Sequence, residues 1–135
     1  MDKMLIESAL SCLDRSYAPY SGFNVAACVL SGSGRIYTGV NVENASYPAG
    51  ICAECSAISA AISSGETSII KIAVVGGKNK IASDYCAPCG ICRQVMREFC
   101  DPSEFKVLMA RSASDYKEMT LESLLPLSFG PESLR

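Results

Sequence analysis

Apolar residues recur along this chain with two different periods, and the change from one period to the other predicts its secondary structure. Residues 3–14 carry apolar side chains at roughly helical spacing, which predicts an amphipathic helix. Two apolar runs, residues 23–30 and 35–42, flank the turn sequence SGSG. Two such runs around a glycine-containing turn predict a β-hairpin directly after the first helix.

The central part of the chain predicts a second helix followed by a buried strand. Residues 53–63 are rich in alanine and precede Gly65, a residue type that commonly lies just beyond a helix C-terminus. Residues 68–77 read SIIKIAVVGG, and such a continuous apolar run is typical of a strand covered on both faces.

The last third predicts a helix, a strand and a short helix. Residues 92–100 look helical and Pro102 closes them, residues 105–110 predict a strand, and residues 120–126 predict a helix with Thr120 as its N-cap. The complete order is α-β-β-α-β-α-β-α. This order predicts an α/β fold in which a sheet lies between helices.

Length and charge narrow the possible functions. The 135 residues support one hydrophobic core, so we expect residues 1–135 to form a single domain. The formal net charge is −2, and lysine and arginine form no run. A groove for nucleic acid needs clustered basic residues that displace counterions from phosphates, so we expect no nucleic-acid partner.

The cellular compartment matters because the chain has eight cysteines. Asp2, Lys3 and Glu7 interrupt the segment in which a signal peptide needs apolar residues, and no stretch is apolar and long enough to span a bilayer. We therefore expect a cytoplasmic protein without membrane contact, whose cysteines are reduced thiols. Clustered thiols in that compartment indicate a metal site or catalysis.

The clustered cysteines form two C-x-x-C pairs, Cys52 with Cys55 and Cys89 with Cys92. Structural zinc sites take four ligands from the protein, whereas catalytic sites take three and leave one position for water. All four cysteines together would form a closed site, and Cys52, Cys89 and Cys92 alone would form an open one. Cys86 adds a further possible pair with Cys89.

Glu54 favours the open site. Residues two apart on a regular helix point in different directions, so Cys52 and Glu54 can face one ion only if Cys52 has a non-helical conformation at the helix start. Pro88 and Cys89 precede the next helix in a similar way, and positive helix ends stabilise thiolates. A carboxylate beside a thiolate-bound zinc can act as a general base. Glu54 could equally be an ordinary first-turn acid, so the spacing alone leaves both sites open.

Beyond the spacing, Cys-x-Glu followed by Pro-Cys-x-x-Cys resembles the signature of the zinc-dependent cytidine deaminases in its three-cysteine form. Four longer blocks resemble, in the same order, the small homotetrameric enzymes of pyrimidine salvage. They are YAPYSGFNVAA (17–27), GVNVENASYPAGICAE (39–54), PCGICRQVMREF (88–99) and LLPLSFGPESL (124–134). The resemblance covers almost the whole chain and implies a three-layer α-β-α sandwich with a central mixed sheet.

The resemblance implies an activity as well: hydrolytic deamination of cytidine and 2′-deoxycytidine to uridine and 2′-deoxyuridine, with release of ammonia. In this reading Cys52, Cys89 and Cys92 hold Zn²⁺, zinc-bound hydroxide attacks C4 of the base, and Glu54 shuttles the proton. The alternatives are a zinc-stapled structural module, deamination of a nucleoside-like antibiotic such as blasticidin S, and editing of RNA or DNA.

The family pattern also assigns substrate contacts. Asn41 and Glu43 match positions that hydrogen-bond a ribose hydroxyl, and residues at alternate strand positions can reach one sugar together. Phe23 matches an aromatic residue that packs against the pyrimidine. The backbone N–H of Ala53 would bind the base carbonyl, because the first N–H groups of a helix lack helical partners.

Two further aromatic residues match intersubunit positions. Phe129 matches a C-terminal aromatic residue that reaches into a neighbouring site, and Tyr47 lies near the contacts between subunits. The resemblance therefore implies a homotetramer with sites shared between subunits. Ordinary core or turn packing is the alternative role for Phe23, Tyr47 and Phe129.

One position departs from the family pattern: Cys55 stands where such enzymes often have an arginine beside the ligand cysteines. It could be an inert apolar residue, a fourth ligand, or a partner in a rearranged hydrogen-bond shell, and we expect the first. Arg93 is near in sequence and could replace the missing cation. The remaining cysteines are expected to fill the core; they are Cys12, Cys28, Cys86 and Cys100.

Overall fold

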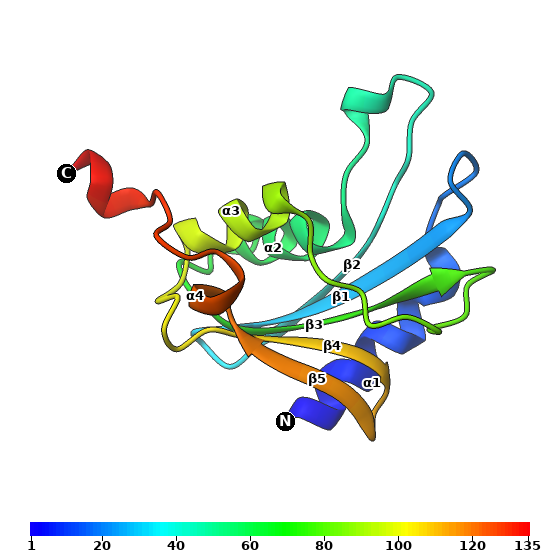
Figure 1. Cartoon of the computed structure of the whole chain (residues 1–135), viewed down its shortest axis with the longest axis horizontal. Coiled ribbons are helices and arrows are strands. Elements are labelled where there is room, and N and C mark those ends of the chain that lie inside the picture. Colours follow the sequence, from blue (N-terminus) through cyan, green and yellow to red (C-terminus); the bar gives the residue numbers. More distant parts are fainter.

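A five-stranded sheet runs through the middle of the molecule, with helices on both faces (Figure 1). The computed structural model describes all 135 residues. Its main elements are α1 (Asp2–Cys12), β1 (Phe23–Ser31), β2 (Ile36–Val40), α2 (Ala53–Ser63), β3 (Ile69–Lys78), α3 (Gly90–Glu98), β4 (Lys106–Ser112), β5 (Asp115–Thr120) and α4 (Leu121–Leu124). Three single 3₁₀ turns are η1 (Leu13–Arg15), η2 (Tyr47–Ala49) and η3 (Pro131–Leu134).

The sheet is mixed, as expected. Its strand order is β2-β1-β3-β4-β5. Strand β1 pairs antiparallel with β2 and β3, β3 pairs parallel with β4, and β4 pairs antiparallel with β5. The parallel pair β3 and β4 is joined through α3, because parallel neighbours need a crossover connection.

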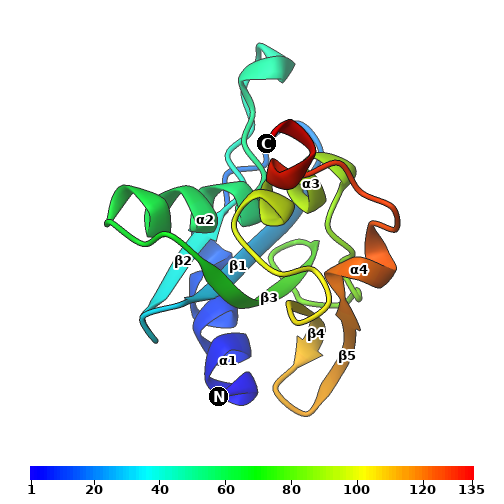
Figure 2. The same cartoon turned by 90° about the vertical axis from the view of Figure 1, so that its left-hand side faces the viewer.

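The two faces of the sheet carry separate cores, because successive strand residues point to opposite sides. One face packs against α1, the other against α2 and α3, and Figure 2 shows these helices on opposite sides. The α1 face presents Ala26, Cys28, Leu30, Ala73, Val75, Leu108 and Ala110. The α2 and α3 face presents Ala27, Val29, Ile72, Val74, Val107 and Met109. The molecule is thus the predicted three-layer sandwich.

The structure differs from the sequence prediction most clearly in α3, β2 and β5. Helix α3 spans Gly90–Glu98 rather than 92–100, because it begins directly after Cys89. The second strand ends at Val40, since the chain then leaves the sheet and keeps only isolated bridges at Val42. Strand β5 was not predicted, because it is an exposed edge strand without an apolar run.

Two segments project from the sandwich in Figure 1. One is the loop between β2 and α2, which contains η2 and also projects in Figure 2, and the other is the C-terminal segment with η3. The C-terminal segment is attached to α3, where buried Arg97 donates to Ser128 and forms an ion pair with Glu132. No helix of the chain combines the length and apolarity needed to cross a lipid bilayer.

Candidate active site

Three cysteine sulfurs gather where the N-termini of α2 and α3 meet. Cys52 is the N-cap of α2, with φ −75° and ψ 154°, and Cys89 is the N-cap of α3, with φ −69° and ψ 169°. Both residues are extended, which confirms the predicted non-helical conformation. The sulfurs of Cys52, Cys89 and Cys92 all lie within 4.8 Å of one another.

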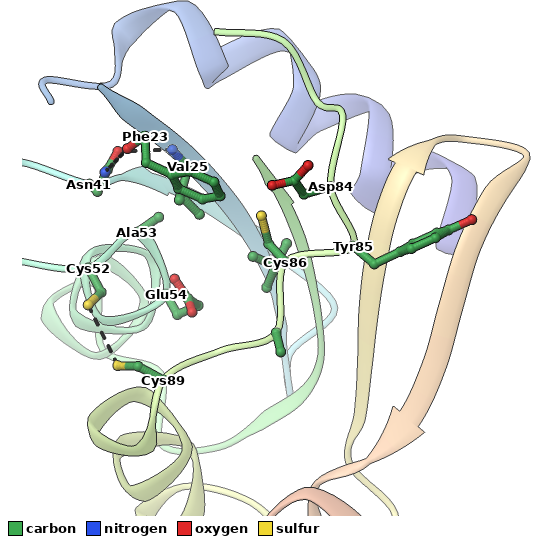
Figure 3. A pocket seen from close by; sticks show the side chains of 12 residues that line it. Phe23, Val25, Asn41, Cys52, Ala53, Glu54, Asp84, Tyr85, Cys86 and Cys89 are labelled. Carbon is green, nitrogen blue, oxygen red and sulfur yellow. Dashed lines mark hydrogen bonds between the residues drawn. The ribbon is translucent and has the colours of Figure 1, made fainter. Parts of the chain in front are cut away.

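The spacing of these sulfurs fits a zinc ion. Two thiolates bound at about 2.3 Å to a tetrahedral zinc lie about 3.8 Å apart. The Sγ atoms of Cys52 and Cys89, joined by a dashed line in Figure 3, are separated by 3.8 Å, and those of Cys89 and Cys92 are separated by 3.6 Å. Two helix N-termini directed at the cluster also favour the thiolate form that zinc requires.

The other candidate ligands lie outside this cluster. The Cys55 sulfur is 3.4 Å from that of Cys92, but Cys55 is not one of the three residues whose ligand atoms lie mutually close. Cys86 is buried in the core and also stands outside the cluster. The arrangement therefore favours three protein ligands and an open site.

Glu54 lies in the first turn of α2, and its side chain points into the pocket beside the sulfurs (Figure 3). It is one of the few buried charged residues, with 5% of its surface exposed. Burial raises the pKa of this carboxyl above its ordinary value, since the charged form loses its hydration. A carboxyl with a raised pKa can both accept and return a proton near neutral pH.

The electrostatics of the thiols also favour a cation. Burial raises the pKa of Cys52 to about 11 and raises that of Cys92 as well, because the thiolate form loses its hydration. The negative charges of neighbouring thiolates and of Glu54 act in the same direction. Burial acts in the same direction on Cys89, but backbone and side-chain hydrogen bonds outweigh it and lower its pKa. Three thiolates and a carboxylate cannot share this space without a positive counter-charge, which a divalent metal supplies.

A pocket of about 370 Å³ opens beside the cluster, a volume in the range of small-molecule sites. Figure 3 shows its lining, which combines apolar walls with a few polar groups. The residues are Phe23, Val25, Asn41, Cys52, Ala53, Glu54, Val74, Asp84, Tyr85, Cys86, Ala87 and Cys89. Phe23 and Ala53, both predicted to contact the base, are thus brought to the same pocket as Glu54.

A second pocket of about 430 Å³ adjoins the first, and Asn41 and Cys52 line both. Glu43 and Tyr47 belong to this second pocket. Of the predicted substrate-binding residues, only Phe129 lines neither. Phe129 is 58% exposed and lies on the projecting C-terminal segment.

Proteins of known activity resemble this chain over most of its sequence. The family described as "Cytidine and deoxycytidylate deaminase zinc-binding region" matches residues 1–109. The sequence is also 40% identical to a cytidine deaminase of Halalkalibacterium halodurans, over 99% of this chain and 98% of that protein. The chain belongs to the zinc-dependent cytidine deaminase family. It is thus a zinc-dependent hydrolytic deaminase, and Zn²⁺ is its cofactor.

Solved structures agree with this assignment to the deaminase family. The cytidine deaminase of Burkholderia pseudomallei has a TM-score of 0.83 and 38% identity, covering 93% of this chain and 97% of that chain. The cytidine deaminase of Mycobacterium tuberculosis has a TM-score of 0.79 and 36% identity, covering 94% of this chain and 95% of that chain. The predicted deaminase-like sandwich is therefore confirmed.

Sequence reasoning missed several residues that shape the deaminase pocket. Asp84 and Tyr85 line it from the irregular segment before α3, whose pattern has no regular period. Cys86, expected only as a core residue or a possible pair for Cys89, lines the pocket as well. Tyr85 turns away from the pocket in Figure 3, and its hydroxyl donates to Asp115 on β5 over 2.5 Å. The only sequence signal that Asp84 and Tyr85 lie near the site was their position just before the Pro-Cys-x-x-Cys block.

Asn41 and Glu43 are held by hydrogen bonds that the sequence did not predict. The Asn41 side-chain oxygen accepts from Ser16 Oγ and from the N–H of Val25, and its amide nitrogen donates to the Phe23 carbonyl. The Glu43 carboxylate accepts from the N–H groups of Tyr20 and Ser21 and from the Ser21 hydroxyl. Both side chains are therefore fixed in position before any ligand binds.

Arg93 does not replace the arginine that this deaminase lacks. Its guanidinium donates to the backbone carbonyls of Pro88 and Leu124, at 2.7 and 2.6 Å, and to no sulfur. It therefore fixes the loop before α3 to the region of α4. The other cysteines expected in the core are buried, except Cys100, which is half-buried.

Proposed function

We propose that this chain catalyses the hydrolytic deamination of cytidine and 2′-deoxycytidine to uridine and 2′-deoxyuridine. One observation carries the proposal: the buried carboxyl of Glu54 lies beside a three-sulfur cluster and inside a pocket of small-molecule size. The runner-up, a closed structural zinc site, requires Cys55 in the cluster, and its position outside the cluster disfavours that role.

Cys52, Cys89 and Cys92 are the proposed zinc ligands, and bound zinc supplies a Lewis acid that makes water nucleophilic at neutral pH. Glu54 takes one proton from this water and delivers it to N3 of the ring while the water oxygen adds to C4. Glu54 then transfers the second proton to the 4-amino group, which leaves as ammonia. Water and cytidine thus yield uridine and ammonia, with one carboxyl acting first as base and then as acid.

The pocket walls are proposed to position the base. Phe23 and Val25 offer apolar surface for one face of the pyrimidine. Ala53 is the first residue of α2, so its N–H has no partner within the helix and is available to the carbonyl oxygen of the base. Together they would hold C4 next to Glu54, and such orientation contributes a large part of the rate in bound reactions.

The ribose is proposed to bind Asn41 and Glu43. The Asn41 oxygen already accepts two hydrogen bonds, and one amide hydrogen is used, so the second amide hydrogen remains to donate to a sugar oxygen. The Glu43 carboxylate accepts three hydrogen bonds and retains capacity for a hydroxyl donor. Both residues line the second pocket, which is continuous with the first through Asn41.

Charge favours nucleosides over nucleotides as substrates. The linings of the two pockets include the carboxyl groups of Glu43, Glu54 and Asp84 but no lysine or arginine. A 5′-phosphate bound there would lack a basic partner and would be repelled by the carboxylates. We therefore infer that cytidine and deoxycytidine, rather than their monophosphates, are the substrates.

We further propose that the active form is a homotetramer whose sites are shared between subunits. Tyr47 is 75% exposed and Phe129 58% exposed, and both lie on segments that project from the sandwich (Figure 1). Exposed aromatic residues on projecting segments are typical of interface anchors. Analytical ultracentrifugation should give the mass of four chains, and a Phe129→Ala variant should keep its zinc while losing catalytic efficiency.

The cellular role follows from the same proposals. We infer that residues 1–135 act as a single domain in the cytoplasm and serve pyrimidine salvage. None of the eight cysteines is paired in a disulfide, which fits a reducing compartment. Fractionation of the source cells should place the activity with the cytoplasmic proteins, and a membrane or exported location would contradict this part of the proposal.

The activity is tested by incubating the purified, zinc-loaded protein with cytidine, deoxycytidine and cytidine monophosphate. Both nucleosides should lose the cytosine absorbance and release one ammonia each, whereas the monophosphate should react far more slowly. A Glu54→Gln variant should keep its zinc while turnover falls by roughly 10²-fold or more. Zinc-loaded protein that releases no ammonia from either nucleoside would refute the proposal.

A further inference from the structure

We propose that Cys55 is a positioning residue whose thiol donates a hydrogen bond to the sulfur of Cys92 and thereby tunes this zinc ligand. The inference rests on the proposed function, because it takes Cys52, Cys89 and Cys92 as the ligands. It departs from the sequence expectation that Cys55 is an inert apolar residue, and it also differs from the alternative in which Cys55 is a fourth ligand.

The two C-x-x-C pairs occupy matching positions on the two helices. Cys52 and Cys89 are the N-caps of α2 and α3, and Cys55 and Cys92 are the third residues of those helices. The two N-cap sulfurs lie 3.8 Å apart and the two third-residue sulfurs 3.4 Å apart. The helices thus face each other through two sulfur contacts, of which only the second includes a residue outside the metal cluster.

The direction of the second contact follows from the chemistry of a zinc ligand. A cysteine that binds zinc is a thiolate, which can accept a hydrogen bond but cannot donate one. The hydrogen in the contact between Cys55 and Cys92 must therefore belong to Cys55. Cys55 has no other side-chain hydrogen-bond partner, and Cys92 is fully buried, so water cannot take the place of this donor.

No cation performs the same task. Arg93, the arginine nearest in sequence, binds two backbone carbonyls instead of a sulfur. No lysine or arginine lines the adjoining pocket. The thiol of Cys55 is therefore the side-chain donor available to moderate the charge on Cys92.

Such a donor has two physical effects. It fixes the orientation of the Cys92 side chain, and it withdraws electron density from a sulfur that would otherwise give more of it to the metal. Loss of a hydrogen-bond partner of a metal ligand typically costs 10–100-fold in metal affinity or activity. A residue of cysteine size can supply the bond here because α2 and α3 bring the two sulfurs into contact.

The test compares Cys55→Ala with Cys55→Ser in the zinc-loaded protein. The alanine variant cannot donate a hydrogen bond, whereas the serine hydroxyl can. The zinc dissociation constant is measured by competition with a chromophoric chelator. We expect Cys55→Ala to bind zinc about 10-fold more weakly than wild type, and Cys55→Ser to retain most of the wild-type affinity.

Cys100 provides a matched control, since it is also half-buried, packs against the same core cluster and forms no side-chain hydrogen bond. Both Cys100→Ala and Cys100→Ser should leave zinc affinity unchanged. If Cys55→Ala binds zinc as tightly as wild type, Cys55 is an inert residue and the proposal is overturned.

Cobalt substitution separates the donor from a fourth ligand. The thiolate-to-cobalt absorption grows with the number of bound thiolates, so it should keep its three-thiolate intensity in Cys55→Ser. A drop in that intensity would make Cys55 a ligand and overturn the proposal, even if the alanine variant failed to fold. Both measurements are made without substrate, so their outcome is independent of whether the protein deaminates cytidine.

Discussion

Gly39 offers a direct test of how the sheet positions the active site. It lies on β2 opposite Ala27, where the first turn of α2 packs closely onto the strand. A Cβ atom added there would lie 2.8 Å from the carbonyl oxygen of Ala53 and 2.8 Å from Cβ of Ser56, and closer still to the backbone nitrogen of Ala57. These are mainly backbone atoms, so the clash cannot be relieved by turning a side chain.

The magnitude of a Gly39→Ala effect follows from these distances. Ordinary contact begins at 3.4 Å, and the backbone nitrogen of Ala57 is nearer than the two atoms at 2.8 Å, so α2 must move away from β2 by more than 0.6 Å. Overpacking of this kind costs about 1–3 kcal/mol, and the stiffer unfolded chain offsets about 0.4–1 kcal/mol of it. The midpoints of these two ranges differ by about 1.3 kcal/mol, and we expect a net loss of this order in the free energy of unfolding. The same movement displaces Cys52 and Glu54, and a misplacement near 1 Å can reduce kcat/KM roughly 100-fold.

The assay combines unfolding in denaturant with steady-state deamination of cytidine. Gly32→Ala is the matched control, because its added Cβ would meet only the hydroxyl of Ser68, which can rotate away. We expect the control to keep both stability and activity. A Gly39→Ala protein with wild-type stability and kcat/KM would show that β2 does not position α2 in this way.

Three further predictions follow from other contacts. Burial raises the pKa of Glu54. A carboxyl with a raised folded-state pKa stabilises the fold at low pH and loses this contribution as the pH rises. Metal-free Glu54→Gln should therefore unfold at a higher temperature than metal-free wild type at pH 8, with a smaller difference at pH 4. Thr120 caps α4, because its hydroxyl oxygen accepts a hydrogen bond from the N–H of Ser123 at 3.1 Å. Thr120→Ala should lower the free energy of unfolding by about 1 kcal/mol in a urea titration. An unchanged unfolding midpoint would show that this hydrogen bond does not stabilise the helix. A Cβ on Gly130 would lie 2.6 Å from both terminal nitrogens of the buried Arg97 guanidinium. Gly130→Ala should therefore loosen the C-terminal segment and speed its removal by carboxypeptidase. Equal rates of removal in the variant and the wild type would argue against the attachment of this segment through Arg97.

Much of the fold was predictable because the buried strands carry their own signal. Strands β1, β3 and β4 are apolar on both faces, and the alanine-rich α2 ends close to the predicted position. Strand β5 gave no such signal, since four of its six residues are polar and its central residues are exposed. Its strand structure comes from pairing with β4, a tertiary effect that local sequence does not carry.

Part of the candidate site was also predictable from the sequence, and part of it was not. The extended conformation of Cys52 was predictable, because only a non-helical N-cap lets Cys52 and Glu54 face one ion. The segment that carries Asp84 was not predictable. Its path begins with left-handed conformations at Asn79 and Lys80, and it is fixed by the bond from Tyr85 to a distant strand. The contact between Cys55 and Cys92 likewise depends on how two helices pack.

The central claim is that three cysteine sulfurs bind the metal and leave its fourth position free beside Glu54. X-ray absorption at the zinc edge of the purified, zinc-loaded protein measures this most directly. We predict three sulfur neighbours and one lighter atom around the zinc, in the wild-type protein and in Cys55→Ser alike. Four sulfur neighbours in the wild type would contradict the account and make the site a structural one.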